Sequence, residues 1–166
     1  MPLSLVHMQI RIIAVGRIKE KYLKDAIAEY EKRLRPYVNL QVIVLAEERR
    51  AGNASVSQET YLKEQEGVRI LESIPPETFM IALDVTGSKW SSEELARNIR
   101  EWGVAGKSSI AFVIGGDLGL GQNVLTRCNL RLSLSPLTFT HQMARVILLE
   151  QIYRSMRINR GEPYHK

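Results

Sequence analysis

Residues 110–121 read IAFVIGGDLGLG, so that five apolar residues run directly into a segment with four glycines. An uninterrupted apolar run of this length is typical of a strand that is buried on both faces of a parallel sheet. Glycines that follow such a strand allow a tight turn in which backbone amides approach a ligand closely. The segment therefore predicts an α/β protein with a candidate ligand loop at the end of a central strand.

The same alternation of strands and helices extends over the rest of the chain. Short β-branched or apolar runs predict four more strands, at residues 9–15, 40–45, 78–83 and 130–134. Apolar residues at three- and four-residue spacing predict the intervening helices, one of them opened by a capping box of Ser91 and Glu94. Together these elements predict an α/β fold with a mainly parallel sheet and helices on both faces. We interpret residues 8–166 as one domain and residues 1–7 as an N-terminal extension.

The last predicted helix, residues 141–159, carries more apolar surface than one buried face requires. Two-sided burial explains this width, and a subunit interface is one way to obtain it. The helix is therefore compatible with a subunit interface.

The charge of the chain is unevenly distributed. Its 23 basic and 18 acidic residues give a net charge of +5 over 166 residues. Residues 8–40 carry +4, residues 141–166 carry +3, and the stretch between them carries −2. Basic ends of this size are compatible with a nucleic-acid partner and equally with solvated helix faces.

Composition also excludes several classes of protein. A single cysteine, Cys128, allows no internal disulfide and fits a reducing cytoplasm. The chain has no apolar run of about 20 residues, so we expect no membrane span, and its start does not resemble a signal peptide. The three histidines, His7, His141 and His165, lack the spacing of metal ligands, so we expect no metal site.

Ligands of parallel α/β sheets bind beyond the carboxyl ends of the strands. Three loops are candidates on this ground: residues 84–90, 115–121 and 135–140. The glycine order differs from the dinucleotide fingerprint and from the phosphate-binding loop, so a plain tight turn stays an alternative. Ser135, His141 and Asp117 offer a hydrolase triad, but no G-x-S-x-G segment accompanies them.

The tail at residues 160–166, RGEPYHK, places an aromatic ring, an imidazole and a cation next to one another. Such a group can stack on a nucleic-acid base and titrate near neutral pH. A frayed terminus is the alternative interpretation.

Two segments, FVIGGDLGLG at 112–121 and LSLSPLTFTHQMARVILLEQIYRSMRINRGEPYHK at 132–166, resemble the ribosomal RNA large-subunit methyltransferase H family. These are small single-domain SPOUT methyltransferases. The opening IIAVGRIKEKY at 12–22 is also similar, and the resemblance covers residues 8–166. It implies a C-terminal trefoil knot, S-adenosyl-L-methionine as cofactor and a homodimer. It also implies methylation of N3 of a pseudouridine in 23S ribosomal RNA of the assembled ribosome.

The resemblance also implies the site residues. The cofactor contacts would be Leu83, Gly115, Gly116, Leu134, Ser135, Pro136, Leu137, Thr138 and Phe139. In the tail, His165 would act as general base and Tyr164 would stack on or orient the substrate base. Arg145, Arg154 and Lys166 would hold phosphate or stabilise the anionic ring.

The residues themselves leave alternative bases and alternative functions open. His141 is a second candidate base, although its place at a helix start favours a structural role because the helix dipole disfavours an imidazolium there. A ribosomal RNA-binding assembly factor without catalysis and a nucleotide-dependent hydrolase using Ser135 are the other functions considered. In the methyltransferase interpretation, we expect the basic C-terminal segment to lie beside the cofactor loops.

Overall fold

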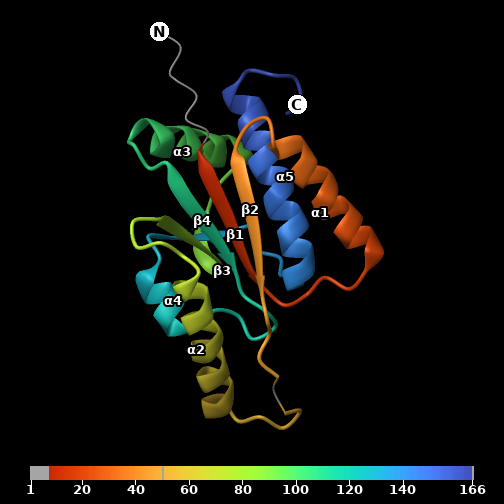
Figure 1. Cartoon of the computed structure of the whole chain (residues 1–166), viewed down its shortest axis with the longest axis vertical. Coiled ribbons are helices and arrows are strands. Elements are labelled where there is room, and N and C mark those ends of the chain that lie inside the picture. Colours follow the sequence, from red (N-terminus) through yellow and green to blue (C-terminus); the bar gives the residue numbers. More distant parts are fainter. Residues whose placement is uncertain (1–7, 50, 166) are drawn as a thin grey trace.

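The computed structural model describes residues 8–49 and 51–165, which form a parallel sheet flanked by helices (Figure 1). The strands are β1 (Gln9–Val15), β2 (Asn39–Leu45), β3 (Phe79–Lys89), β4 (Ser109–Ile114) and β5 (Leu130–Ser133). They lie in the order β2-β1-β4-β3-β5, and each neighbouring pair is parallel. Strand β4 is central, between β1 and β3, as its unbroken apolar run predicts.

Helices cover both faces of this sheet, which confirms that prediction. They are α1 (Lys21–Leu34), α2 (Val56–Glu72), α3 (Ser92–Val104), α4 (Gln122–Arg127) and α5 (His141–Asn159). One face packs against α1, α3 and α5, and the other against α2 and α4. The predicted capping box at the start of α3 is present, with Ser91 and Glu94 each satisfying an amide of the first turn.

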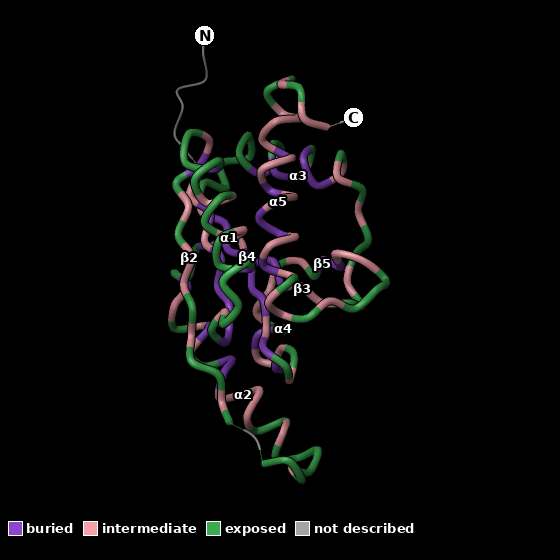
Figure 2. The backbone as a smooth tube through the Cα atoms, turned by 90° about the vertical axis from the view of Figure 1, so that its right-hand side faces the viewer, coloured by how far each residue is buried: buried purple, intermediate pink, exposed green. Residues whose placement is uncertain are grey.

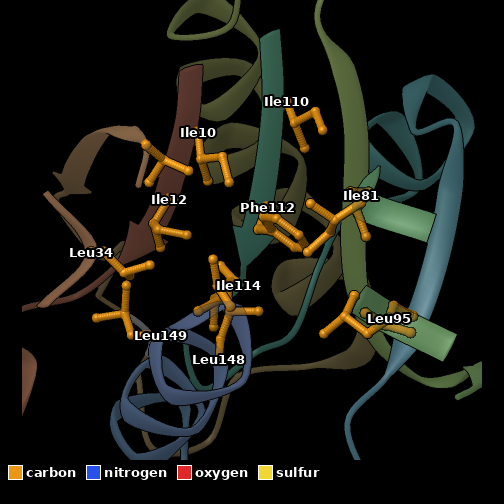
Figure 3. Close-up of a cluster of buried hydrophobic side chains, with 14 of the residues drawn as sticks. Ile10, Ile12, Leu34, Ile81, Leu95, Ile110, Phe112, Ile114, Leu148 and Leu149 are labelled. Atoms are coloured by element: carbon orange, nitrogen blue, oxygen red, sulfur yellow. The ribbon is translucent and has the colours of Figure 1, made fainter. Parts of the chain in front are cut away.

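The larger of two apolar clusters lies between the sheet and the α1, α3 and α5 layer (Figure 3). Phe112 of β4 is at its centre, with Leu148 and Leu149 of α5 below the same strand. Figure 2 shows this burial along the strands and the inner side of α5, with exposed residues at the far end of α2. The α5 helix therefore packs against the face of the central strands through its buried side.

Strand β3 is longer than predicted. The sequence predicts its end at Leu83, but the strand continues to Lys89, with a register irregularity between Leu83 and Ser88. The candidate loop at residues 84–90 is thus mostly strand. The polar run after Leu83 breaks the apolar pattern, and pairing with β5, where Gly87 lies against the backbone of Arg131, continues the strand.

No helix in the described part of the chain is long and apolar enough to cross a membrane.

Candidate functional site

A cavity of about 320 Å³ opens beside residues 83–85 of β3 and at the carboxyl ends of β4 and β5. The first turn of α5 closes it on one side, through Thr140, His141 and Ala144. Eight of the nine predicted cofactor contacts line this single cavity: Leu83, Gly115, Gly116, Leu134, Ser135, Leu137, Thr138 and Phe139. Pro136 is not among its lining residues. The folded chain therefore brings together two loops that are separated in the sequence.

The glycine loop forms one wall of the cavity by a close backbone turn. The Gly119 amide donates a hydrogen bond of 3.0 Å to the Gly116 carbonyl, and Gly119 has a positive φ of 82°. A Cβ at Gly115 would lie only 2.8 Å from the Gly119 carbonyl carbon. Glycine is required here because the loop folds back on itself beside the end of β4.

The loop between β5 and α5 forms the second wall of the cavity. Hydrogen bonds made by its own hydroxyl groups hold its conformation. Ser133 Oγ donates to the Ser135 carbonyl at 3.1 Å, and Ser135 Oγ accepts the Leu137 amide at 3.0 Å. Thr140 Oγ1 caps α5 by accepting the Met143 amide at 3.2 Å. The loop thus holds its backbone against the cavity through hydrogen bonds within itself.

His141 lies at the edge of the cavity and pairs with Asp117 of the glycine loop. Its Nδ1 is 2.9 Å from Asp117 Oδ1, and the imidazole is 13% exposed. Two members of the predicted hydrolase triad are therefore in contact. Ser135 lines the same cavity, but its hydroxyl serves the Leu137 amide, and no bond to His141 is seen among the described residues.

Arg154, Tyr164 and His165, three of the residues predicted to act on the substrate, gather at the other end of α5. Arg154 Nη1 lies 3.1 Å from His165 Nδ1, and the guanidinium stacks over the Tyr164 ring at 4.7 Å. Glu150 joins them, since its Oε1 accepts Arg154 Nη2 at 2.6 Å and the Tyr164 hydroxyl at 3.0 Å. The tail is therefore packed against α5 rather than frayed. We call Glu150, Arg154, Tyr164 and His165 the tail cluster.

Burial and the carboxylate of Glu150 raise the pKa of Tyr164 to about 12. The phenol is consequently protonated at neutral pH and acts there as a hydrogen-bond donor, not as a base. The Tyr164 phenol is therefore not the candidate base of the tail cluster, which leaves the His165 imidazole in that role.

Arg145, another residue predicted to act on the substrate, lies elsewhere and is buried. It is 2% exposed, and its Nη2 donates to the carbonyl oxygens of Val15 and Gly16 at the end of β1. Burial lowers the pKa of this guanidinium. Arg145 therefore ties α5 to β1 in this structure instead of joining the tail cluster. Lys166, predicted to contact phosphate, lies outside the described residues.

The basic C-terminal segment, residues 141–166, lies beside the cofactor loops only at its start within one chain, through His141 and Ala144, whereas the tail lies apart from them. The cavity contacts α5 as far as Ala144, whereas the tail packs on its later turns at Glu150 and Arg154. Ten residues separate Ala144 from Arg154, or about 15 Å along a helix. In Figure 1 the tail follows the last turn of α5, at the opposite end of the helix from its first turn.

Comparison with known proteins agrees with this architecture. The family model described as "Predicted SPOUT methyltransferase" matches residues 8–165. The chain belongs to the SPOUT methyltransferase family. It is 57% identical to a protein of Methanoregula boonei, 54% to one of Clostridium novyi and 52% to one of Clostridium acetobutylicum. Each match spans 159 residues, which is 96% of this chain and the whole relative. The two clostridial proteins are named ribosomal RNA large subunit methyltransferase H.

In this SPOUT methyltransferase, sequence reasoning missed the two carboxylates that organise the tail. Glu150 lies one helical turn before Arg154, a spacing that could have indicated the ion pair. Glu93 of α3 lies 2.6 Å from His165 Nε2, a contact that spans 72 positions and has no local signal. Within the described residues, no group of three or more His, Cys, Asp or Glu side chains is placed to hold a metal ion.

Proposed function

We propose that this chain is an S-adenosylmethionine-dependent methyltransferase that acts on N3 of a pseudouridine in 23S ribosomal RNA of the assembled ribosome. The observation that carries the proposal is the convergence of eight predicted cofactor contacts on one cavity. The names of the clostridial relatives support ribosomal RNA of the large subunit as the substrate.

The cavity residues suit this cofactor. Leu83, Ile114 and Leu132 offer apolar surface for an adenine ring, and the glycine loop offers backbone polar groups. Asp84 and Asp117 supply carboxylates near a ligand that carries a sulfonium and an ammonium group. When bound, S-adenosylmethionine supplies an electrophilic methyl group. The surrounding residues bind and orient it.

The tail cluster provides the other half of the chemistry. The imide N3–H of the substrate must lose its proton as the new bond forms, and an imidazole is suited to accept it near neutral pH. His165 takes this role, and Tyr164 offers an aromatic face for the substrate base. Arg154 stabilises the negative charge that develops on the ring.

A homodimer is proposed because one chain keeps the cavity and its own tail apart. A complete site then needs the tail of the partner subunit near the cavity. The α5 helix has a surface for such an interface, since Met143 is 41% exposed and Val146 and Ile147 are only partly covered. Two chains of +5 also give a dimer of +10, which favours RNA binding that weakens with salt.

A trefoil knot is proposed where the chain leaves β5. That strand lies at one edge of the sheet, while α5 packs under β1 and β4, so residues 134–140 cross the sheet between them. This crossing segment and the glycine loop line the same cavity.

A substrate in the ribosome and the single, free Cys128 also support a cytoplasmic protein.

The test is deletion of residues 164–166. We expect loss of methyl incorporation into ribosomes with nearly unchanged S-adenosylmethionine affinity by calorimetry, because the cavity is built without the tail. Tyr22→Ala, an exposed tyrosine on α1, is the control and should keep full activity. Unchanged turnover in the deletion would refute the role of the tail. Ribosome binding by the intact chain without any cofactor binding would instead favour an assembly factor.

A further inference from the structure

Both ring nitrogens of His165 are held by side chains of different helices. Nε2 lies 2.6 Å from Glu93 Oε1, at the start of α3, and Nδ1 lies 3.1 Å from Arg154 Nη1, on α5. The imidazole is 29% exposed, so part of the ring faces solvent. His165 is thus placed between a carboxylate and a guanidinium.

The chemistry of these two neighbours determines which nitrogen carries the proton. A guanidinium has only hydrogen-bond donors, so a hydrogen bond between Arg154 and Nδ1 requires the lone pair of Nδ1. The proton of the neutral ring then resides on Nε2 and is donated to Glu93, which is a pure acceptor when ionised. The arrangement therefore selects the Nε2–H tautomer.

Glu93 is well suited to remain ionised in this position. It is the second residue of α3, and the backbone amides of the helix start, together with His165, lower the pKa of its carboxyl group. The neighbouring Glu94 serves the capping box, which leaves Glu93 to reach the tail.

Packing between the two helices fixes the distance from Glu93 to the tail. Ser92 Oγ donates to Gln151 Oε1 at 2.6 Å, and Asn159 Nδ2 donates to the Ala96 carbonyl at 2.9 Å. These bonds join α3 to α5 at Gln151 and Asn159, near the tail cluster. Glu93 and His165 therefore belong to one packed unit of α3, α5 and the tail, and both would keep these positions in a dimer.

We propose that Glu93 is a positioning residue that holds His165 as its Nε2–H tautomer and thereby makes Nδ1 the atom that accepts the substrate proton. This inference rests on the proposed function. The substrate N3–H takes the place of Arg154 Nη1 at Nδ1, and the released guanidinium lies beside the ring that becomes anionic.

The proton and electron balance of the step is complete. The N3–H proton passes to Nδ1, and the N3 electron pair forms the bond to the methyl carbon. The electron pair of the broken carbon–sulfur bond stays on the sulfur of the departing thioether. Glu93 then stabilises the imidazolium through its hydrogen bond to Nε2–H, as a carboxylate does for a catalytic histidine.

Two substitutions separate the charge of Glu93 from its hydrogen bond. Glu93→Gln keeps an acceptor oxygen, so we expect the Nε2–H tautomer to persist while kcat falls about tenfold. Glu93→Ala removes both and leaves only the contact with Arg154 to favour Nε2–H, so we expect the Nδ1–H tautomer to become populated beside it and kcat to fall about 100-fold. Glu93→Asp should recover part of the activity.

KM for ribosomes and cofactor affinity should change little, since Glu93 lies away from the cavity lining. Glu101→Gln, an exposed change on the same helix, is the matched control.

The tautomer is read from the nitrogen chemical shifts of the His165 ring in the free protein. A His165→Ala variant assigns the signals. Wild-type tautomer populations in Glu93→Ala, or wild-type kcat in that variant when His165→Ala is inactive, would overturn the role of Glu93 and leave the proposed function intact. Absence of methylation by the wild-type chain would overturn the proposed function, while the nitrogen shifts would still decide whether Glu93 sets the tautomer.

Discussion

At the scale of single residues, Gly115 shows how the absence of a side chain allows the glycine loop to fold tightly beside the cavity. It follows β4 directly and lies against the backbone of Gly119 in the same loop. The local sequence predicts the turn, but the closeness of the two backbones is a property of the folded loop.

A Gly115→Ala substitution should therefore weaken cofactor binding. Its Cβ would lie 2.8 Å from the Gly119 carbonyl carbon and 2.9 Å from the oxygen, so the loop must shift. We expect a loss of about tenfold or more in S-adenosylmethionine affinity by calorimetry, from overpacking of about 1–3 kcal/mol. Gly52→Ala is the control, because a Cβ there meets nothing within 4 Å. Equal affinities for both variants would argue against this cavity as the cofactor site.

A second prediction at the scale of single residues concerns how the ionisation of Tyr164 depends on pH. Its pKa is raised from 10.0 to about 12, so the folded state binds the phenolic proton more tightly than the unfolded chain. The stabilisation is fully present below about pH 10 and is lost as the pH rises through about 12. We expect a late step in the tyrosinate absorbance titration that Tyr164→Phe removes and Tyr22→Phe retains. A Tyr164→Phe titration identical to wild type would contradict the packed tail.

At the scale of elements, the ends of β3 and α5 depend on neighbours that are distant in sequence. The sequence predicts the start of β3 to within one residue, but not its continuation to Lys89 along β5. For α5, periodicity predicts both ends, yet the contact of Arg145 with β1 spans about 130 positions. Propensity describes an element in isolation, and pairing or burial then changes its limits and its contacts.

Arg145→Lys tests how α5 is attached to β1. A lysine places a compact ammonium on a flexible stem and cannot reproduce the planar guanidinium that reaches both carbonyls. We expect the free energy of unfolding in urea to fall by about 1–3 kcal/mol, because a buried acceptor loses its donor. Arg97→Lys, on the exposed side of α3, should change it by less than about 0.5 kcal/mol. Wild-type stability combined with weaker RNA binding would instead support an RNA contact by Arg145.

At the scale of the whole molecule, the distance between the cavity and the tail cluster determines the proposed assembly. A single chain presents the two parts on different turns of α5, so the proposed reaction requires two chains arranged with the tail of one near the cavity of the other. Charge and composition alone are equally compatible with a monomer.

Mixing two inactive variants tests this arrangement. His165→Ala removes the base and Gly115→Val blocks the cavity, so each homodimer should be inactive. After subunit exchange, half of the dimers are mixed, and each mixed dimer has one cavity and one tail intact. We expect methylation of ribosomes to recover to about one quarter of the wild-type rate if sites are shared across a two-fold dimer. No recovery, despite mixed dimers detected by mass spectrometry, would assign the tail to its own chain.

The amino-acid sequence by itself determined the five strands, the helices on both faces and the two loops that line the cavity. It could do so because periodicity, capping residues and glycine turns act over a few neighbouring positions. Only the tertiary structure decided the extension of β3, the buried place of Arg145, the pairing of Glu93 with His165 and the distance of the tail from the cavity. Each of these depends on packing between segments far apart in the chain, where no local pattern specifies which side chains meet.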